Sequence, residues 1–72
     1  MISENQLKAI YDFSSWLEKE CPGCYVTHFQ SVEKEGVEVL VQYPDTQYLD
    51  RMGELSIEVG DQYEIVIIPT PI

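Results

Sequence analysis

The chain has 72 residues and is strongly acidic, since thirteen Asp and Glu residues against four Lys and Arg residues give a formal net charge of −9 at pH 7. Phosphate backbones and anionic membranes repel such a surface, which argues against direct nucleic-acid binding and membrane association. The hydrophobic fraction of 44% is typical of a globular chain rather than a disordered one. We expect one small domain over residues 1–72, with a core close to the lower limit for independent folding.

The N-terminal residues contain no basic segment followed by an apolar one, and no apolar run approaches the roughly 18 residues of a membrane span. We therefore expect a cytoplasmic protein. In that compartment two cysteines are more often reduced thiols than a structural disulfide.

The first predicted element is a helix over residues 4–20. Ser3 and Gln6 have the spacing of a capping box, and an apolar stripe follows at helical period through Leu7, Ile10, Phe13 and Leu17. Trp16 lies well off the centre of this stripe. Two interpretations of it stay open, namely a contact residue for a partner and a ring partly covered by neighbouring Lys or Glu stems.

The segment after this helix predicts a β-hairpin. Pro22 and Gly23 favour a type II turn, and strands are expected over 25–32 and 37–43 with a loop over 33–36. In that loop Gly36 would take a left-handed conformation. The loop sets a register with Glu33 opposite Val37 and Phe29 opposite Val41. The face expected to be buried then carries Tyr25, Thr27 and Phe29 with Val37, Val39 and Val41.

A second helix is expected after Pro44, with Asp45 or Thr46 as its cap and Gly60 just past its end. Residues 54–59 also alternate strictly between apolar and polar, so a strand there is a competing prediction. The last strand is predicted over 64–68 and ends at Pro69.

These elements predict an α+β fold, a small two-layer sandwich of order α-β-β-α-β. Its three-stranded mixed sheet would carry both helices on one face, with the last strand parallel to the strand over 37–43. The other sheet face would then be uncovered, and a face of that kind on a small domain commonly meets another chain. The candidate partner surface comprises Trp16, Val26, His28, Val32, Leu40, Val66 and Ile68.

Cys21 and Cys24 form a C-x-x-C motif, with a turn disulfide and a plain thiol pair as the alternatives. They follow a helix C-terminus beside acidic residues, whereas a thioredoxin-type thiolate needs a helix N-terminus. Adding His28 as a metal ligand fails on geometry, because four extended steps place it roughly 13 Å from Cys24 and zinc ligands lie within roughly 4 Å of one another. A metal shared between two copies of the motif is a further alternative.

No catalytic motif or nucleophile–base pair is recognisable, and no metal-binding or cofactor-binding set of residues is predicted, so we expect a protein that is not an enzyme and has no cofactor. The leading hypothesis is a small acidic interaction or adaptor domain that associates with another protein or with itself, as a homodimer, through the open sheet face. The alternative is a polyanion mimic of the phage type, which inhibits a basic nucleic-acid-binding protein. A metal or redox module built on the cysteine motif is the third hypothesis.

Overall fold

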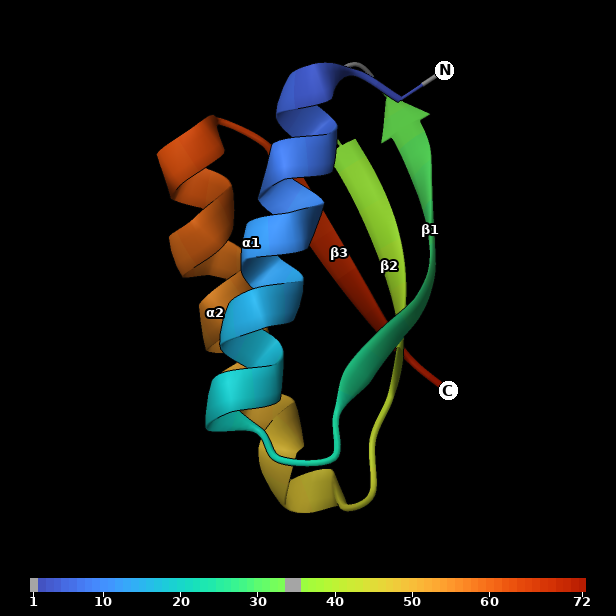
Figure 1. Ribbon diagram of the computed structural model, residues 1–72, viewed down its shortest axis with the longest axis vertical. Helices are drawn as coiled ribbons and strands as arrows, with labels where there is room; N and C mark the ends of the chain where they lie inside the picture. Colours follow the sequence, from blue (N-terminus) through green and yellow to red (C-terminus); the bar gives the residue numbers. More distant parts are fainter. Residues whose placement is uncertain (1, 34–35) are drawn as a thin grey trace.

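The computed structural model describes residues 2–33 and 36–72. The elements are α1 (Glu4–Glu20), β1 (Tyr25–Glu33), β2 (Gly36–Gln42), the 3-10 turn η1 (Thr46–Tyr48), α2 (Leu49–Tyr63) and β3 (Val66–Pro71). The sheet has the order β1-β2-β3, with β1 antiparallel and β3 parallel to β2. Both helices lie on the same side of this sheet (Figure 1). The predicted two-layer α+β fold is therefore confirmed.

The start of α1 follows from a local signal. The Oγ of Ser3 accepts a hydrogen bond from the Gln6 amide at 3.0 Å, and the Oε1 of Gln6 accepts one from the Ser3 amide at 2.8 Å. These two bonds complete the predicted capping box. Gln6 is also buried, and its Nε2 donates to Ser31 Oγ and to the carbonyls of Glu33 and Gly36. One side chain thus caps the helix and fastens it to the hairpin.

The chain reverses from α1 into β1 through the predicted tight turn. Gly23 has φ of +91°, and the amide of Cys24 donates to the carbonyl of Cys21 at 3.0 Å. A positive φ at the third residue of the turn is the type II geometry, and glycine adopts it without strain. A Cβ at Gly23 would also lie 2.9 Å from Cγ of Pro44, so this position has no room for a side chain.

The hairpin register differs from the predicted one. Phe29 lies opposite Val39 rather than Val41, and Glu33 lies opposite Gly36 rather than Val37. Residues 34 and 35 of the predicted loop lie outside the described residues. Gly36, which was predicted to lie in the loop, is instead the first residue of β2.

Two irregularities in β1 explain the difference. Thr27 and Val32 are each an extra residue on β1 between consecutive pairs with β2. An extra residue reverses the alternation of the strand beyond it. Val26 therefore lies opposite Val41 on the helix-covered side, and Tyr25 lies opposite Gln42 on the open side. The sequence-based prediction had these two side chains on the opposite faces.

Residues 54–59 belong to α2, so the competing strand prediction for them was wrong. The side chain of Asp45 accepts from the Gln47 amide at 3.0 Å and caps the preceding turn η1. The helix continues past Gly60 and ends at Tyr63, and its C-cap residue Glu64 has the left-handed φ of 55°. A Cβ at Gly60 would lie 2.5 Å from the Ile65 carbonyl oxygen. Gly60 is therefore needed for the close approach of the returning chain, not for a left-handed cap.

The last strand, β3, continues through both prolines instead of stopping at Pro69. Ile72 donates its amide to the carbonyl of Val41 at 3.0 Å. Because amides alternate in direction along a strand, the nitrogens of Pro69 and Pro71 point away from β2. Proline is tolerated on such an edge, since no hydrogen bond to the neighbouring strand is lost.

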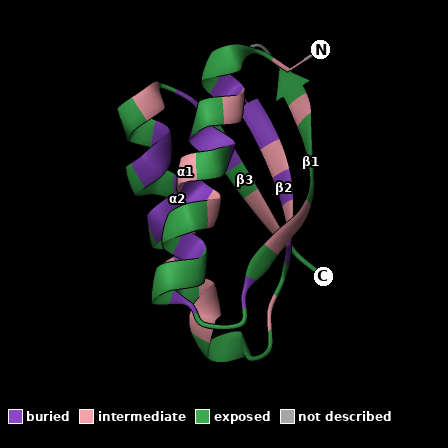
Figure 2. Ribbon diagram, viewed as in Figure 1, coloured by how far each residue is buried: buried purple, intermediate pink, exposed green. Residues whose placement is uncertain are grey.

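The core lies between the helices and the sheet, as the buried positions in Figure 2 indicate. It joins α1, α2, the cysteine turn and the inner sides of β2 and β3 through Ala9, Ile10, Phe13, Leu17, Cys21, Cys24, Val37, Val39, Val41, Met52, Leu55, Val59, Ile65 and Ile67. No residue of β1 is buried. Phe29, predicted to belong to the core, is 43% exposed because it lies on this outer strand. The last strand is buried on one side only.

Candidate interaction surfaces

The first candidate site is the sheet face that neither helix covers. Pairing places His28 opposite Leu40, Gln30 opposite Glu38, and Gly36 beside Val66. Val32, Val66 and Ile68 line one shallow depression at the end of this face, with Glu33 and Gly36. All three apolar side chains are exposed, and Val66 is exposed by 62%. We call the surface formed by His28, Gln30, Val32, Glu38, Leu40, Val66, Ile68 and Thr70 the open sheet face.

A single carboxylate lies at the middle of this surface. Gln30 donates its Nε2 to Glu38 Oε1 at 2.8 Å, and Thr70 donates its hydroxyl to Glu38 Oε2 at 3.2 Å. Both oxygens of Glu38 are therefore hydrogen-bonded to neutral groups, one from each neighbouring strand. This arrangement fixes the carboxylate on the surface without a cation. A second depression of about 280 Å³ lies beside it, lined in part by His28, Gln30 and Leu40.

The acids of the chain are concentrated on the other layer. Eight of the thirteen belong to the two helices, namely Glu4, Asp12, Glu18, Glu20, Asp50, Glu54, Glu58 and Asp61. On α2 they recur three or four residues apart and therefore share one side of the helix. The open sheet face is thus the less charged of the two layers.

Five of the seven residues predicted for the partner surface are brought together on the open sheet face: His28, Val32, Leu40, Val66 and Ile68. Val26 is not among them, because the Thr27 irregularity turns it toward the core, where it packs half-buried against the hydrophobic cluster. Trp16 lies on α1 in the helical layer, so it does not belong to the same surface.

The free edges of the sheet are poorly suited to accepting another strand. On β3 the outward-pointing nitrogens of Pro69 and Pro71 lack the hydrogen that an added strand would need. On β1 the extra residues Thr27 and Val32 interrupt the ladder. Such features oppose edge-to-edge pairing. Neither edge strand therefore offers an uninterrupted row of hydrogen-bonding groups to an added strand.

Cys21 and Cys24 are free thiols, and both are buried in the core. Burial raises the pKa of both thiols, and the neighbouring charges of Cys24 and Glu20 raise the pKa of Cys21 further. Raised pKa values keep the thiols protonated, which suppresses their nucleophilicity near neutral pH. Within residues 2–33 and 36–72 no group of three or more His, Cys, Asp or Glu side chains is placed to hold a metal ion.

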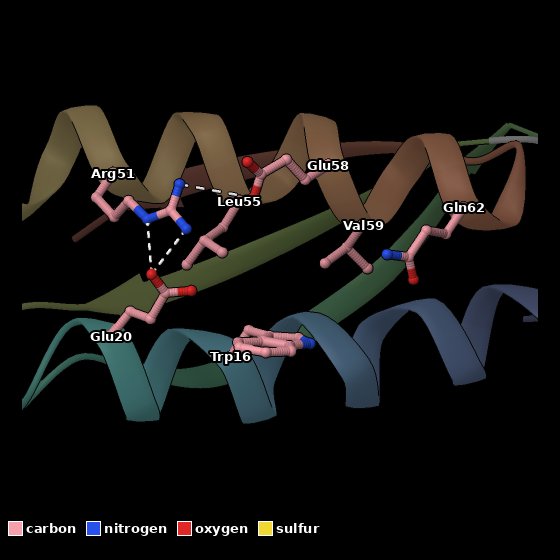
Figure 3. Close-up of a pocket in the computed structure, with 7 residues that line it drawn as sticks. All are labelled: Trp16, Glu20, Arg51, Leu55, Glu58, Val59 and Gln62. Atoms are coloured by element: carbon pink, nitrogen blue, oxygen red, sulfur yellow. Dashed lines mark hydrogen bonds and ion pairs between the residues drawn. The ribbon is translucent and has the colours of Figure 1, made fainter.

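A second candidate site lies between α1 and α2, and sequence reasoning did not find it. Figure 3 shows Trp16 lying between the helices, with Leu55 and Val59 directed toward it from α2. We call this depression of about 440 Å³ the interhelical groove. Trp16 had been singled out for its position off the apolar stripe, but its partners on α2 come from a separate segment. Only packing of the two helices reveals them.

Arg51 closes one end of the interhelical groove. Its Nε and Nη2 donate to Glu20 Oε1 at 3.0 and 2.7 Å, which joins α2 to α1. Its Nη1 also lies 3.4 Å from a Glu54 oxygen and 3.6 Å from a Glu58 oxygen. Hydrogen bonding to Glu20 raises the pKa of Arg51 above its ordinary value. One guanidinium is thus shared among three carboxylates.

No helix in the described part of the chain has the length and apolar character needed to cross a membrane. Comparisons with protein-family models, with curated proteins and with solved structures find no match to this chain.

Proposed function

We propose that this protein is a non-catalytic interaction domain that associates with a second copy of itself through the open sheet face. The observation that carries the proposal is the exposed apolar cluster Val32, Val66 and Ile68, on a sheet face that no element among residues 2–33 and 36–72 covers. Burial of apolar area is the main driving force of association, and scattered polar neighbours set the orientation.

Electrostatics favour this surface over the rest of the molecule for self-association. Two chains of net charge −9 repel each other, and the repulsion is smallest when the contact excludes the acidic helices. Glu38 is the carboxylate at the centre of the open sheet face, and both of its oxygens already accept hydrogen bonds from Gln30 and Thr70. Covering Glu38 therefore removes less hydration than covering an unbonded carboxylate would.

The size of the surface indicates a weak complex. Three strands about 4.8 Å apart, each of about six residues at about 3.3 Å, give a face of about 300 Å² per chain. Stable interfaces bury about 800 Å² per partner. We therefore expect a dissociation constant between about 1 µM and 1 mM, within the range of reversible association.

Sedimentation equilibrium from about 10 µM to 1 mM tests the proposal. We expect a monomer–dimer equilibrium that strengthens when the ionic strength rises from about 0.1 M to about 0.5 M, because salt screens the repulsion between the two acidic chains. A chain that stays monomeric at 1 mM and at both ionic strengths contradicts the proposal.

Matched substitutions locate the contact. Val66→Lys and Tyr11→Lys each replace an exposed apolar or aromatic side chain, 62% and 64% exposed, and each adds one positive charge to the chain. We expect Val66→Lys to weaken dimerisation at least tenfold, and Leu40→Lys to do the same, whereas Tyr11→Lys on α1 leaves it intact or slightly stronger. Equal effects of Val66→Lys and Tyr11→Lys would place the contact elsewhere.

A further inference from the structure

The interhelical groove combines an exposed aromatic ring with an excess of negative charge. Trp16 is 41% exposed, and it lines the groove beside Leu55 and Val59 of α2, which are buried. Leu55 and Val59 form the apolar floor beneath it, and Glu58 and Gln62 line the side formed by α2 (Figure 3). The groove is therefore apolar at its base and acidic along its rim.

The charges of the rim are incompletely balanced. Arg51 is the cation that contacts Glu20, Glu54 and Glu58, so one positive charge faces three negative charges at this end of the groove. Its contacts to Glu54 and Glu58 are the longer ones, at 3.4 and 3.6 Å. The carboxylate of Glu58 is more than half exposed and can accept hydrogen bonds from an incoming donor.

The Trp16 ring already takes part in a contact with a cation. The Nζ of Lys19 lies 5.0 Å from the ring centroid, within the distance of a cation–π interaction. A planar guanidinium can stack on an indole while its edge pairs bidentately with a carboxylate, whereas an ammonium group has no planar face to stack and no such edge. The groove is thus better matched to arginine than to lysine.

We propose that the interhelical groove binds an arginine side chain of a basic segment of another protein, which stacks on Trp16 and pairs with Glu58. Neighbouring basic residues of that segment contact the carboxylates along α2, at Asp50, Glu54 and Asp61. Charge complementarity identifies the occupant, because a second copy of this chain brings a further charge of −9 to an already acidic rim. This surface lies on the layer opposite the open sheet face and is independent of self-association (Figure 1).

Titration with acetyl-hexaarginine amide tests the proposal, with the fluorescence of Trp16 as the readout, since the chain contains one tryptophan. We expect a saturable spectral change that weakens at least fivefold between about 50 and 200 mM salt. Hexalysine of the same length should bind at least threefold more weakly, because it lacks the planar group that stacks. Val66→Lys on the open sheet face should leave binding of hexaarginine within about twofold of the parent.

Variants separate the groove from general attraction to an acidic protein. Glu58→Gln should weaken hexaarginine binding at least fivefold, whereas Glu4→Gln, which removes the same charge from the exposed start of α1, should change it less than twofold. Trp16→Leu, followed by calorimetry, should weaken binding similarly, with folding verified by circular dichroism. Arg51→Met should strengthen it, because the three carboxylates lose their shared cation.

Equal losses in Glu58→Gln and Glu4→Gln, or full affinity in Trp16→Leu, would overturn the proposal. Either result would mean that the whole acidic surface attracts polycations without a defined groove. Binding of hexalysine as tight as that of hexaarginine would overturn the arginine assignment.

Discussion

The two faces of the central strand β2 share one backbone, but they differ in what covers them. Val37, Val39 and Val41 are fully buried beneath the two helices. On the opposite face Glu38 and Leu40 are half-buried, and neither helix lies above them (Figure 1). One face therefore accounts for the stability of the fold, and the other is available for contact with another chain. The alternating direction of side chains along a strand therefore produces two surfaces, and the packing of the helices decides which of the two becomes the core.

The helical layer and the open sheet face also differ in charge. The helices that cover the inner face carry eight acids, whereas the open sheet face has the carboxylate of Glu38 at its centre and that of Glu33 beside its apolar cluster. Our two proposals therefore assign a partner of like charge to the sheet and a basic partner to the helices.

The largest expected contrast is between the two phenylalanines. Phe13 is fully buried beneath α1, and Phe29 is 43% exposed on the outer strand. Phe13→Ala should cost about 3–5 kcal/mol of unfolding free energy, through lost burial and a cavity. Phe29→Ala should cost less than about 1 kcal/mol. Urea unfolding followed by circular dichroism measures both values. Similar losses would mean that the helices cover β1 as well as β2.

A smaller effect is expected at the buried polar contact between α1 and the hairpin. Gln6→Ala removes the donor to the carbonyls of Glu33 and Gly36 and half of the capping box. We expect a loss of about 1–3 kcal/mol, because the helix loses half of its capping box and the Gly36 carbonyl loses a buried donor. Glu4→Ala, at an exposed position of the same turn, serves as the control and should cost less than about 0.5 kcal/mol. Equal losses in the two variants would contradict this role of Gln6.

The smallest expected effect is a gradual decrease in the free energy of unfolding as the pH rises. Burial raises the pKa of the Cys21 and Cys24 thiols, and burial together with the hydrogen bond to Asp12 raises the pKa of Tyr63. A group whose pKa is higher in the folded than in the unfolded state favours folding while it is protonated. This contribution to the free energy of unfolding is fully present below the unfolded-state pKa, which is about 8.5 for a thiol. It is lost as the pH rises through the folded-state pKa. At pH 9 the loss should be less than about 1 kcal/mol per thiol.

Urea unfolding between pH 7 and 10 in the presence of a reductant measures this decline. In the parent, thiol-reactive dyes should modify the cysteines at pH 8 only after unfolding. A Cys21→Ala, Cys24→Ala double variant should show a shallower pH dependence. A free energy of unfolding that stays constant to pH 10, or rapid labelling of the native protein, would contradict the burial of Cys21 and Cys24 in the core.

Several features of the fold could be predicted because their signals are local. The capping box of Ser3 and Gln6 defines the first turn of α1, and the Pro22–Gly23 pair defines the turn into β1. The period of the apolar residues on α2 and their alternation along β2 indicate the buried sides of both elements. The α+β architecture follows from these signals, since the helices and the sheet each present one apolar side.

Other features depend on contacts between distant segments. The extra residues Thr27 and Val32 follow from how β1 pairs with β2, and they transfer Val26 from the open face to the core. Gly60 is required by the Ile65 carbonyl that returns beside it, and not by a helix end. The prolines of β3 are tolerated because this strand lies at the edge of the sheet. The sequence contains these residues, but no short-range pattern indicates their neighbours.

The sequence by itself thus determined the elements, their order and the candidate residues His28, Val32, Leu40, Val66 and Ile68, because alternation and helical period are properties of consecutive residues. Only the tertiary structure decided which surfaces they form. It removed Val26 from the open sheet face and placed Trp16 of α1 in one groove with Arg51 and Glu58 of α2. The physical reason is that packing between elements far apart in the chain decides which side chains are buried and which stay exposed together.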